Sequence, residues 1–231
     1  LYDISFALRS GEILGIFGLL GSGKTELVNA IFGAIAKDGG EIFVEGQRVD
    51  IRTPVDGRKN RLGLVPIDRK LEGLALGMSV KDNLTLSNIE GLGKGAFIDP
   101  RLELAKAEKW VNEVRIKTPS VYTPVSSLSG GNQQKVVVAK WLESGSRVII
   151  LNEPTRGVDV GAKVEIYQLM EELCEQGAGI IMISSELPEI LSIADRILVL
   201  CEGRITAEYD QADATQEKLM DAATRLGGRE L

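Results

Sequence analysis

The strongest constraint on the fold is the segment Gly18–Thr25, which reads GLLGSGKT. It matches the phosphate-loop pattern G-x-x-x-x-G-K-[ST] at every fixed position and follows the apolar run Ile13–Phe17. A helix is expected directly after it, over Thr25–Phe32, ended by Gly33. Glycines let backbone N–H groups turn toward phosphate oxygens, and the positive end of the helix dipole adds to that attraction. The alternative is a glycine-rich turn that binds no ligand.

This pattern gives each fixed residue a role. Lys24 should reach the β- and γ-phosphates of a nucleoside triphosphate, and Thr25 should offer its hydroxyl group to Mg²⁺. The residues expected to contact the nucleotide are Gly18, Leu19, Leu20, Gly21, Ser22, Gly23, Lys24, Thr25 and Glu26.

The order of apolar segments predicts an α/β fold. Short continuous apolar runs, typical of buried parallel strands, alternate with segments of helical periodicity in the second half of the chain. This alternation favours a mostly parallel sheet that is covered on both faces. Further strands are expected at Ile4–Leu8, Leu62–Val65, Val148–Leu151, Ile180–Ile183, Ile197–Leu200 and Arg204–Tyr209, with a hairpin turning at Glu45-Gly46.

A helical insertion is expected in the middle of the chain, over about residues 80–145. Leu104, Ala107, Val111 and Val114 recur at helical spacing and form one apolar stripe. We expect a flexible interruption at Gly91, Gly93 and Gly95, and a helix that begins at Asp99-Pro100. A later helix should cover Gly131–Leu142.

A carboxylate follows the apolar strand Val148–Leu151, in the sequence Asn152-Glu153-Pro154. Ligands of open α/β sheets bind at the carboxyl ends of the strands, so both side chains are expected beside the phosphate loop. Glu153 is the candidate general base that polarises an attacking water. Asn152 can offer an amide oxygen to Mg²⁺, which prefers anionic oxygens, so the metal site should be weak. The alternative is a strand-end Glu that caps a turn.

A second glycine-rich helix start lies at Leu128–Lys135. Ser129 precedes Gly130 and Gly131, so a hydroxyl group, exposed N–H groups and a helix N-terminus are all offered to an anion. By itself the segment could be a helix cap after a loop.

Composition excludes several classes of site. The chain contains no histidine, which removes His-based triads, His metal sites and His-dependent switches. The formal net charge of −6 argues against broad nucleic-acid binding. Cys174 and Cys201 lie in apolar segments without metal-ligand spacing and are interpreted as reduced core residues. No apolar run is long enough to span a bilayer.

The three motifs, in this order, resemble the ATPase domain of ABC transporters. Leu128–Lys135 resembles the ABC signature, Val148–Glu153 the Walker B strand, and Thr155–Asp159 the D-loop with Asp159 as its acidic residue. The resemblance covers essentially the whole chain. It implies a P-loop NTPase fold of the ABC ATPase type: one domain over residues 1–231, with a mostly parallel core, an antiparallel β part and a helical subdomain at about 80–145.

Four segments of the sequence are similar to the second ATPase half of bacterial monosaccharide importers. They read LSGGNQQK, PTRGVDVGAK, GLALGMSVKDN and SSELPEI. In these importers of the ribose, galactose and xylose type, two ATPase domains share one polypeptide. Because the sequence starts at Leu1 without Met, in an alternating pattern, we expect it to be a piece of such a chain.

The resemblance also implies cofactors and partners. Two ABC domains pair head to tail with ATP and Mg²⁺ between them, and Ser129, Gly130, Gly131 and Gln133 would face the ATP of the partner. That partner would be the N-terminal ATPase half of the same polypeptide. The pair would sit under a membrane permease, fed by a periplasmic sugar-binding protein, at the cytoplasmic face of the bacterial inner membrane. No nucleic-acid partner is implied.

Three residues depart from the family pattern. Asn152 stands where most members have Asp, Ser185 where active domains carry the switch histidine, and Ile67 at the Q-loop glutamine position. We therefore expect the domain's own site to bind ATP and hydrolyse it poorly, while its signature completes the site of the partner. Two other functions stay open: a regulatory half that binds nucleotide without hydrolysis, and a soluble ABC ATPase that acts on DNA or ribosomes.

Overall fold

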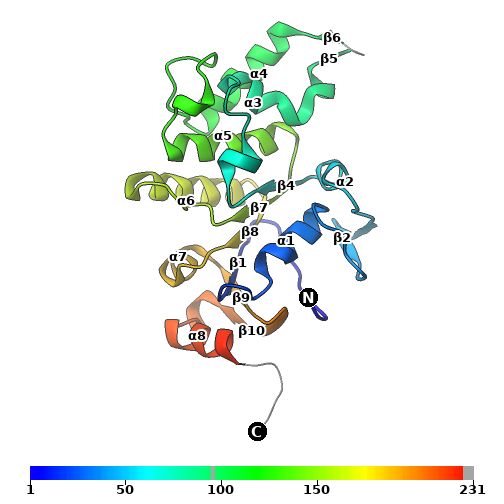
Figure 1. The fold of residues 1–231 in the computed structure, drawn as a ribbon, viewed down its shortest axis with the longest axis vertical. Coiled ribbons are helices and arrows are strands. Elements are labelled where there is room, and N and C mark those ends of the chain that lie inside the picture. The colour runs from blue at the N-terminus through cyan, green and yellow to red at the C-terminus, as the bar shows by residue number, and fades with distance from the viewer. Residues whose placement is uncertain (95–96, 226–231) are drawn as a thin grey trace.

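A six-stranded sheet forms the centre of the computed structural model, which describes residues 1–94 and 97–225 (Figure 1). The strand order is β10-β9-β1-β8-β7-β4, and all neighbours are parallel except β10 and β9. The mostly parallel sheet with an antiparallel part is thus confirmed. The strands are β1 (Ile13–Gly18), β4 (Leu62–Val65), β7 (Val148–Asn152), β8 (Gly179–Ile183), β9 (Arg196–Cys201) and β10 (Arg204–Asp210).

Helices cover both faces of this sheet (Figure 1). Side chains alternate along each strand, so in β7 Ile149 and Leu151 join one apolar cluster while Ile150 joins the other. Burial on both faces explains why the strands read as continuous apolar runs. One face carries α1 (Lys24–Phe32) and α2 (Pro54–Lys59), and the other carries α6 (Val160–Glu175), α7 (Leu187–Ile193) and α8 (Gln216–Thr224).

A helical layer lies beyond the edge strand β4 (Figure 1). It is built from α3 (Val80–Thr85), α4 (Pro100–Glu113) and α5 (Gly130–Glu143), which pack on one another. Asp99 caps α4 and Pro100 is its first residue, as predicted. The helical middle is confirmed except between α3 and α4, where a 3-10 turn (Leu86–Leu92) and a short ribbon of β5 (Gly93–Lys94) and β6 (Phe97–Ile98) occur. Gly95 of the expected interruption lies outside the described residues.

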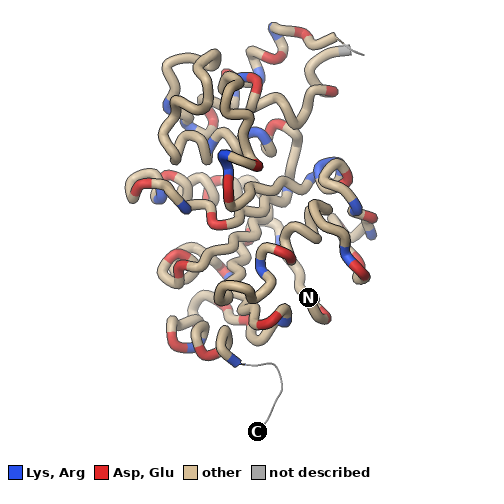
Figure 2. The backbone as a smooth tube through the Cα atoms, in the orientation of Figure 1, with Lys and Arg blue, Asp and Glu red and all other residues tan. Residues whose placement is uncertain are grey.

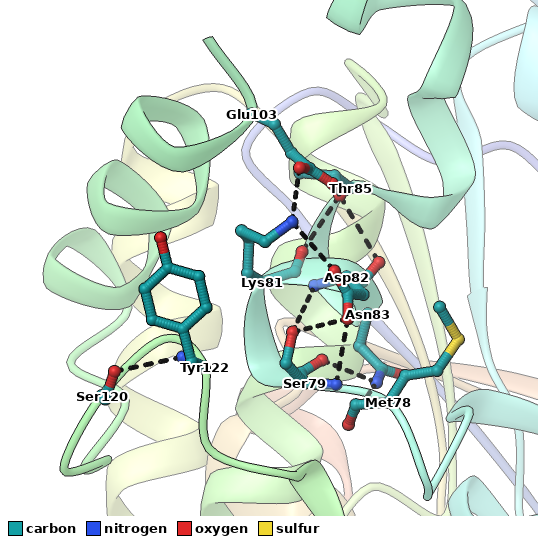
Figure 3. Close-up of polar contacts among 9 residues, drawn as sticks. All are labelled: Met78, Ser79, Lys81, Asp82, Asn83, Thr85, Glu103, Ser120 and Tyr122. Carbon is teal, nitrogen blue, oxygen red and sulfur yellow. Dashed lines mark hydrogen bonds and ion pairs between the residues drawn. The ribbon is translucent and has the colours of Figure 1, made fainter. Parts of the chain in front are cut away.

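Hydrogen-bonded polar side chains fix the start of this layer (Figure 3). Ser79 and Asp82 form a reciprocal cap at the N-terminus of α3. The side chain of Asn83 accepts a hydrogen bond from Ala75 N at 2.8 Å and donates one to Ala75 O at 3.0 Å. The loop that enters α3 is therefore held by a side chain that is itself buried.

Two sequence interpretations need correction. Residues 4–8 form no strand: the segment is extended, and its alternating Ile4, Phe6 and Leu8 pack on the α1 side of the sheet without a strand ladder. The sequence interpretation also missed α2, although Thr53 and Asp56 form a capping box around Pro54. The predicted hairpin is present as β2 (Ile42–Val44) and β3 (Gln47–Val49).

Charged residues of both signs are interspersed over the described elements (Figure 2).

Cys174 and Cys201 are buried free thiols, as expected. None of the described helices is both long and apolar enough to cross a bilayer.

Candidate functional site

Four loops leave the same edge of the sheet, because β1, β4, β7 and β8 are parallel. The register sets Ile16 of β1 and Asn152 of β7 on either side of Ile183 of β8. The phosphate-loop motif begins at the end of β1, Asn152 ends β7 with Glu153 directly after it, and Ser185 lies in the loop that follows β8. The topology thus brings together residues that are far apart in the sequence, at the edge where α/β ligands bind.

The phosphate loop depends on glycine at two positions. A Cβ atom on Gly18 would lie 2.4 Å from the Leu200 carbonyl oxygen, so the loop could not lie this close to β9 with any other residue. Gly23 has φ of 99° and directly precedes α1, which begins at Lys24. The N–H groups at the start of α1 are therefore available to an anion.

Lys24 is buried at the centre of this loop. Its ammonium group donates hydrogen bonds to the Gly18 carbonyl and, at 3.1 Å, to the Leu19 carbonyl. Burial lowers the pKa of Lys24, and the nearby charges of Glu153 and Glu26 oppose that shift. The cation is thus held in place by loop carbonyls, and phosphate oxygens would be stronger acceptors for it.

The charge of Glu153 acts on this cation, and the Glu153 side chain in turn contacts Ser185. Glu153 has φ of 52°, an unusual conformation for a residue with a side chain, and its amide donates to the Ile183 carbonyl at 2.9 Å. The Ser185 hydroxyl donates a hydrogen bond to the Glu153 carboxylate. The serine at the switch position therefore touches the candidate general base directly.

The polar atoms here fit a bound nucleotide with a magnesium ion. The Oδ1 atom of Asn152, which is buried, and the Ser22 hydroxyl have no hydrogen-bond partner in the described part of the chain. An unpaired buried oxygen costs free energy unless a ligand satisfies it. Among the described residues, no group of three His, Cys, Asp or Glu side chains is arranged to hold a metal. Thr25 and Asn152 stay the predicted contacts of Mg²⁺.

A groove of about 400 Å³ runs beside the phosphate loop, lined by Gly18, Leu20, Ser185, Pro188 and Met220 among others. The structure does not bring Ile67 into this lining. Ile67 is half-buried and follows β4, just before the π-helical turn η1 (Arg69–Gly73).

The glycine-rich motif Ser129-Gly130-Gly131 lies at the N-terminus of α5 in the helical layer. Ser129 is exposed, and its hydroxyl accepts a hydrogen bond from the Asn132 amide at 2.9 Å. Gln133 instead is buried and donates to the Val125 carbonyl at 3.2 Å. Ser129, Gly130 and Asn132 can therefore face a partner, whereas the side chain of Gln133 points into the layer.

Asp159 caps α6, accepting from Ala162 N at 3.0 Å, and is exposed. Arg69 joins η1 to the loop before Asp159 by donating to the Arg156 and Gly157 carbonyls at 2.7 and 3.1 Å. The start of α5 also packs on this loop, because a Cβ atom on Gly130 would lie 2.8 Å from the Gly157 carbonyl oxygen.

The model of the family described as "ABC transporter" matches residues 1–156. The chain belongs to the ABC-transporter family. The resemblance stated from the motifs is therefore confirmed, and the residues described above are the candidate site of this ABC ATPase.

Curated relatives of this ABC ATPase include three import proteins. The chain is 51% identical to the "Putative ribose/galactose/methyl galactoside import ATP-binding protein 3" of Burkholderia ambifaria, over 96% of the chain and 44% of that protein. It is 49% identical to the "Xylose import ATP-binding protein XylG" of Geobacillus kaustophilus, over 99% of the chain and 45% of that protein. It is 49% identical to the "Ribose import ATP-binding protein RbsA" of Bacillus licheniformis, over 98% of the chain and 46% of that protein. The chain thus spans less than half the length of these relatives.

Solved structures show the same fold. A nucleotide-free ATP-binding cassette from an ABC transporter superposes with a TM-score of 0.77 at 22% identity, over 96% of this chain and 88% of that chain. The ADP conformation of the cassette MJ1267 gives a TM-score of 0.74 at 23% identity, over 96% of this chain and 87% of that chain.

Four residues that surround the site were missed from the sequence: Arg69, Thr155, Ser184 and Glu189. Arg69 lies in the charged segment Asp68-Arg69-Lys70, which matches none of the motifs described above. The Thr155 and Ser184 hydroxyl groups, from two separate loops, both donate hydrogen bonds to the carboxylate of Glu189 in α7. Their spacing in the sequence carries no pattern that marks these contacts.

Proposed function

We propose that this ABC ATPase is the ATP-binding motor domain of a bacterial importer for simple sugars. Identity of about half over nearly the full chain to ribose and xylose import ATP-binding proteins supports the sugar class. The partners would be a second ATPase half on the same polypeptide, a membrane permease and, indirectly, a periplasmic sugar-binding protein. The domain would act at the cytoplasmic face of the inner membrane.

The observation that carries this proposal is a buried Lys24 ammonium group in the phosphate loop, together with a buried and unsatisfied Asn152 amide oxygen at the carboxyl end of β7. Lys24 and the N–H groups of residues 21–25 would bind the phosphates of ATP, and Thr25 would hold the metal together with Asn152. Mg²⁺ would neutralise charge on the transferring phosphoryl group. Glu153 would orient and polarise the attacking water.

The domain's own site is proposed to be a weak hydrolase. Asn152 supplies no negative charge to Mg²⁺, and Ser185 gives the Glu153 carboxylate a hydroxyl donor where active family members carry histidine. The exposed Ser129 and the half-buried Gly130 would instead complete the ATP site of the partner, where most turnover would occur.

The first test is the ATP affinity of the chain by calorimetry, with Mg²⁺ and with EDTA. The wild-type affinity should change little on removal of Mg²⁺, because Asn152 is uncharged. In the Asn152→Asp variant, Mg²⁺ should raise the affinity about tenfold or more, ~1.4 kcal/mol. Absence of ATP binding by both proteins would overturn the proposal that this site holds nucleotide.

The second test addresses the signature, in the assembled importer with both ATPase halves and the permease. Ser129→Arg should abolish sugar transport, since an arginine side chain would fill the space that faces the partner's ATP. Glu153→Gln should reduce transport much less. The reverse ranking would show that hydrolysis at the domain's own site drives transport.

A regulatory half that never hydrolyses ATP is the second candidate function, and Asn152 and Ser185 favour it. The two are separated by the ATPase rate of the chain. An ATPase rate of the wild-type chain above that of the Glu153→Gln variant would exclude a purely regulatory function.

A further inference from the structure

The carboxylate of Glu189 is buried among hydrogen-bond donors behind the site. Glu189 lies in α7 and is only 5% exposed. Its Oε2 atom accepts from the Ser184 hydroxyl at 2.7 Å. Its Oε1 atom accepts from the Thr155 hydroxyl, from Lys163 Nζ at 2.9 Å and from the Tyr167 hydroxyl at 2.8 Å.

This carboxylate is charged in the folded protein. Burial alone would raise the pKa of Glu189, but the hydrogen bonds from Thr155, Ser184, Lys163 and Tyr167 outweigh burial and lower it. A charged acceptor makes hydrogen bonds about twice as strong as a neutral one. The four donors are therefore bound more firmly than ordinary surface contacts.

The donors belong to three separate parts of the chain. Thr155 is in the loop that follows β7, Ser184 begins the loop that follows β8, and Lys163 and Tyr167 are in α6. Thr155 and Ser184 are both buried, at 2% and 0% exposure. Glu189 thus ties two catalytic loops to each other and to the helix behind them.

These two loops hold the Glu153–Ser185 contact. Thr155 lies two residues after Glu153, and Ser184 directly precedes Ser185, whose hydroxyl donates to the Glu153 carboxylate. We propose that Glu189 is a positioning residue, which fixes the loop 153–159 to the loop 184–186 and so keeps Glu153 and Ser185 in contact. The inference rests on the proposed function only in its assignment of Glu153 as the residue that acts on water.

Hydrogen exchange of the unliganded chain, followed by mass spectrometry, tests this coupling. Thr155→Val removes one hydroxyl from loop 153–159 without changing the side-chain shape, and should speed exchange in peptide 183–188 about tenfold or more. Ser184→Ala should speed exchange in peptide 153–159 in the same way, because coupling is reciprocal. Thr155→Ser, which keeps the hydroxyl, should restore slow exchange.

Glu186→Gln is the matched control. Glu186 also accepts from Lys163, at 3.1 Å, but it is exposed and has no contact with Thr155. This variant should leave exchange in peptide 153–159 unchanged. If Thr155→Val speeds exchange only in its own loop, or if Glu186→Gln has the same effect as Thr155→Val, the proposal is wrong.

ATP affinity and turnover complete the test. Glu189→Gln and Thr155→Val should keep the KM for ATP within about twofold, since neither side chain touches the phosphate loop, while kcat falls about tenfold or more. Should Glu189→Gln fail to fold, the pair Thr155→Val and Ser184→Ala decides. If the wild-type chain does not bind ATP, the proposed function is wrong. If the wild-type chain binds ATP but each variant speeds exchange only in its own loop, only the role of Glu189 is wrong.

Discussion

Among single residues, Lys140 has an unusual setting for a cation. Its ammonium group donates to the Gly73 carbonyl at 2.7 Å and lies 5.1 Å from the ring centroid of Trp141. In the described part of the chain it forms no ion pair. Burial lowers the pKa of Lys140 from 10.5 to about 8. Its charge is therefore less stable in the folded protein than in the unfolded chain.

This shift predicts a pH dependence with a definite sign. Between pH 8 and 10.5 the unfolded chain binds more protons at Lys140 than the folded protein does, so folding stability should rise with pH in that window. Urea unfolding of wild type and Lys140→Met should show this as a free-energy difference that moves in favour of the wild type from pH 8 upward. A difference that stays constant over the window would contradict the prediction.

Residue-level chemistry was predictable only where the motif is continuous. Gly18–Thr25 could be interpreted without a structure because the loop, its preceding strand and its helix lie in one stretch of chain. The contacts of Glu189 could not, since Thr155, Ser184 and Tyr167 meet only after β7 and β8 pair and α6 packs on α7. Gln133 shows the same limit, because helical phase alone did not place its side chain inside the layer.

At the scale of elements, the crossing of α5 and α6 depends on one glycine. A Cβ atom on Gly131 would lie 2.5 Å from the Ala162 Cβ atom, closer than any two such atoms can approach. The start of α5 lies this close to the first turn of α6 only because position 131 has no side chain.

Substitution of alanine at this crossing should separate the two helices. Gly131→Ala should lower the free energy of unfolding by about 1–3 kcal/mol, the usual range for overpacking. The control is Gly161→Ala in α6, where the nearest atom, Asp159 Oδ1, is 3.4 Å from the added Cβ and helix propensity improves. Chemical denaturation measures both variants, and equal stabilities would refute the close-approach argument.

Strands were predicted correctly where burial on both faces determines the apolar pattern, and wrongly where strand formation depends on a neighbouring strand. The apolar runs of β1, β7 and β8 are strands because both faces are covered. Ile4–Leu8 has strand-like alternation, but no neighbouring strand supplies a ladder, so the periodicity reports only which side chains are covered. The helix α2 was missed because only its cap, Thr53 and Asp56, marks it.

At the scale of the whole molecule, a buried ion pair connects distant parts of the chain. Arg196 of β9 donates to the Glu12 carboxylate at 2.7 Å, and both side chains are less than a tenth exposed. Arg196 also bonds to the Ala7 carbonyl and to Glu208 of β10. The guanidinium group of Arg196 thus joins the extended segment before β1 to β9, the strand next to β1, and to β10 at the edge of the sheet.

Removal of this ion pair should lower the stability of the fold, by an amount that depends on pH. Glu12→Gln should lower the free energy of unfolding by about 3–5 kcal/mol, whereas Glu208→Gln, whose carboxylate is 52% exposed, should cost less than about 1 kcal/mol. Burial would raise the pKa of Glu12, but hydrogen bonds from Arg196 and Arg9 bring it below the ordinary 4.5. The contribution of Glu12 is therefore present above pH 4.5 and lost as the pH falls further. Urea unfolding from pH 7 to pH 3 should show the gap between wild type and Glu12→Gln narrowing in acid, and a gap independent of pH would contradict this.

The backbone of Glu153 has a consequence for anyone who evolves this protein in the laboratory. Its left-handed conformation, with φ of 52°, costs a residue with a side chain roughly 1–2 kcal/mol, a strain that Gly or Asn largely avoids. Selection for heat resistance alone would therefore favour loss of the carboxylate, while selection for turnover would retain it. Position 153 is where thermostable descendants of this chain should be sequenced first, because robustness and catalysis compete there for the same residue.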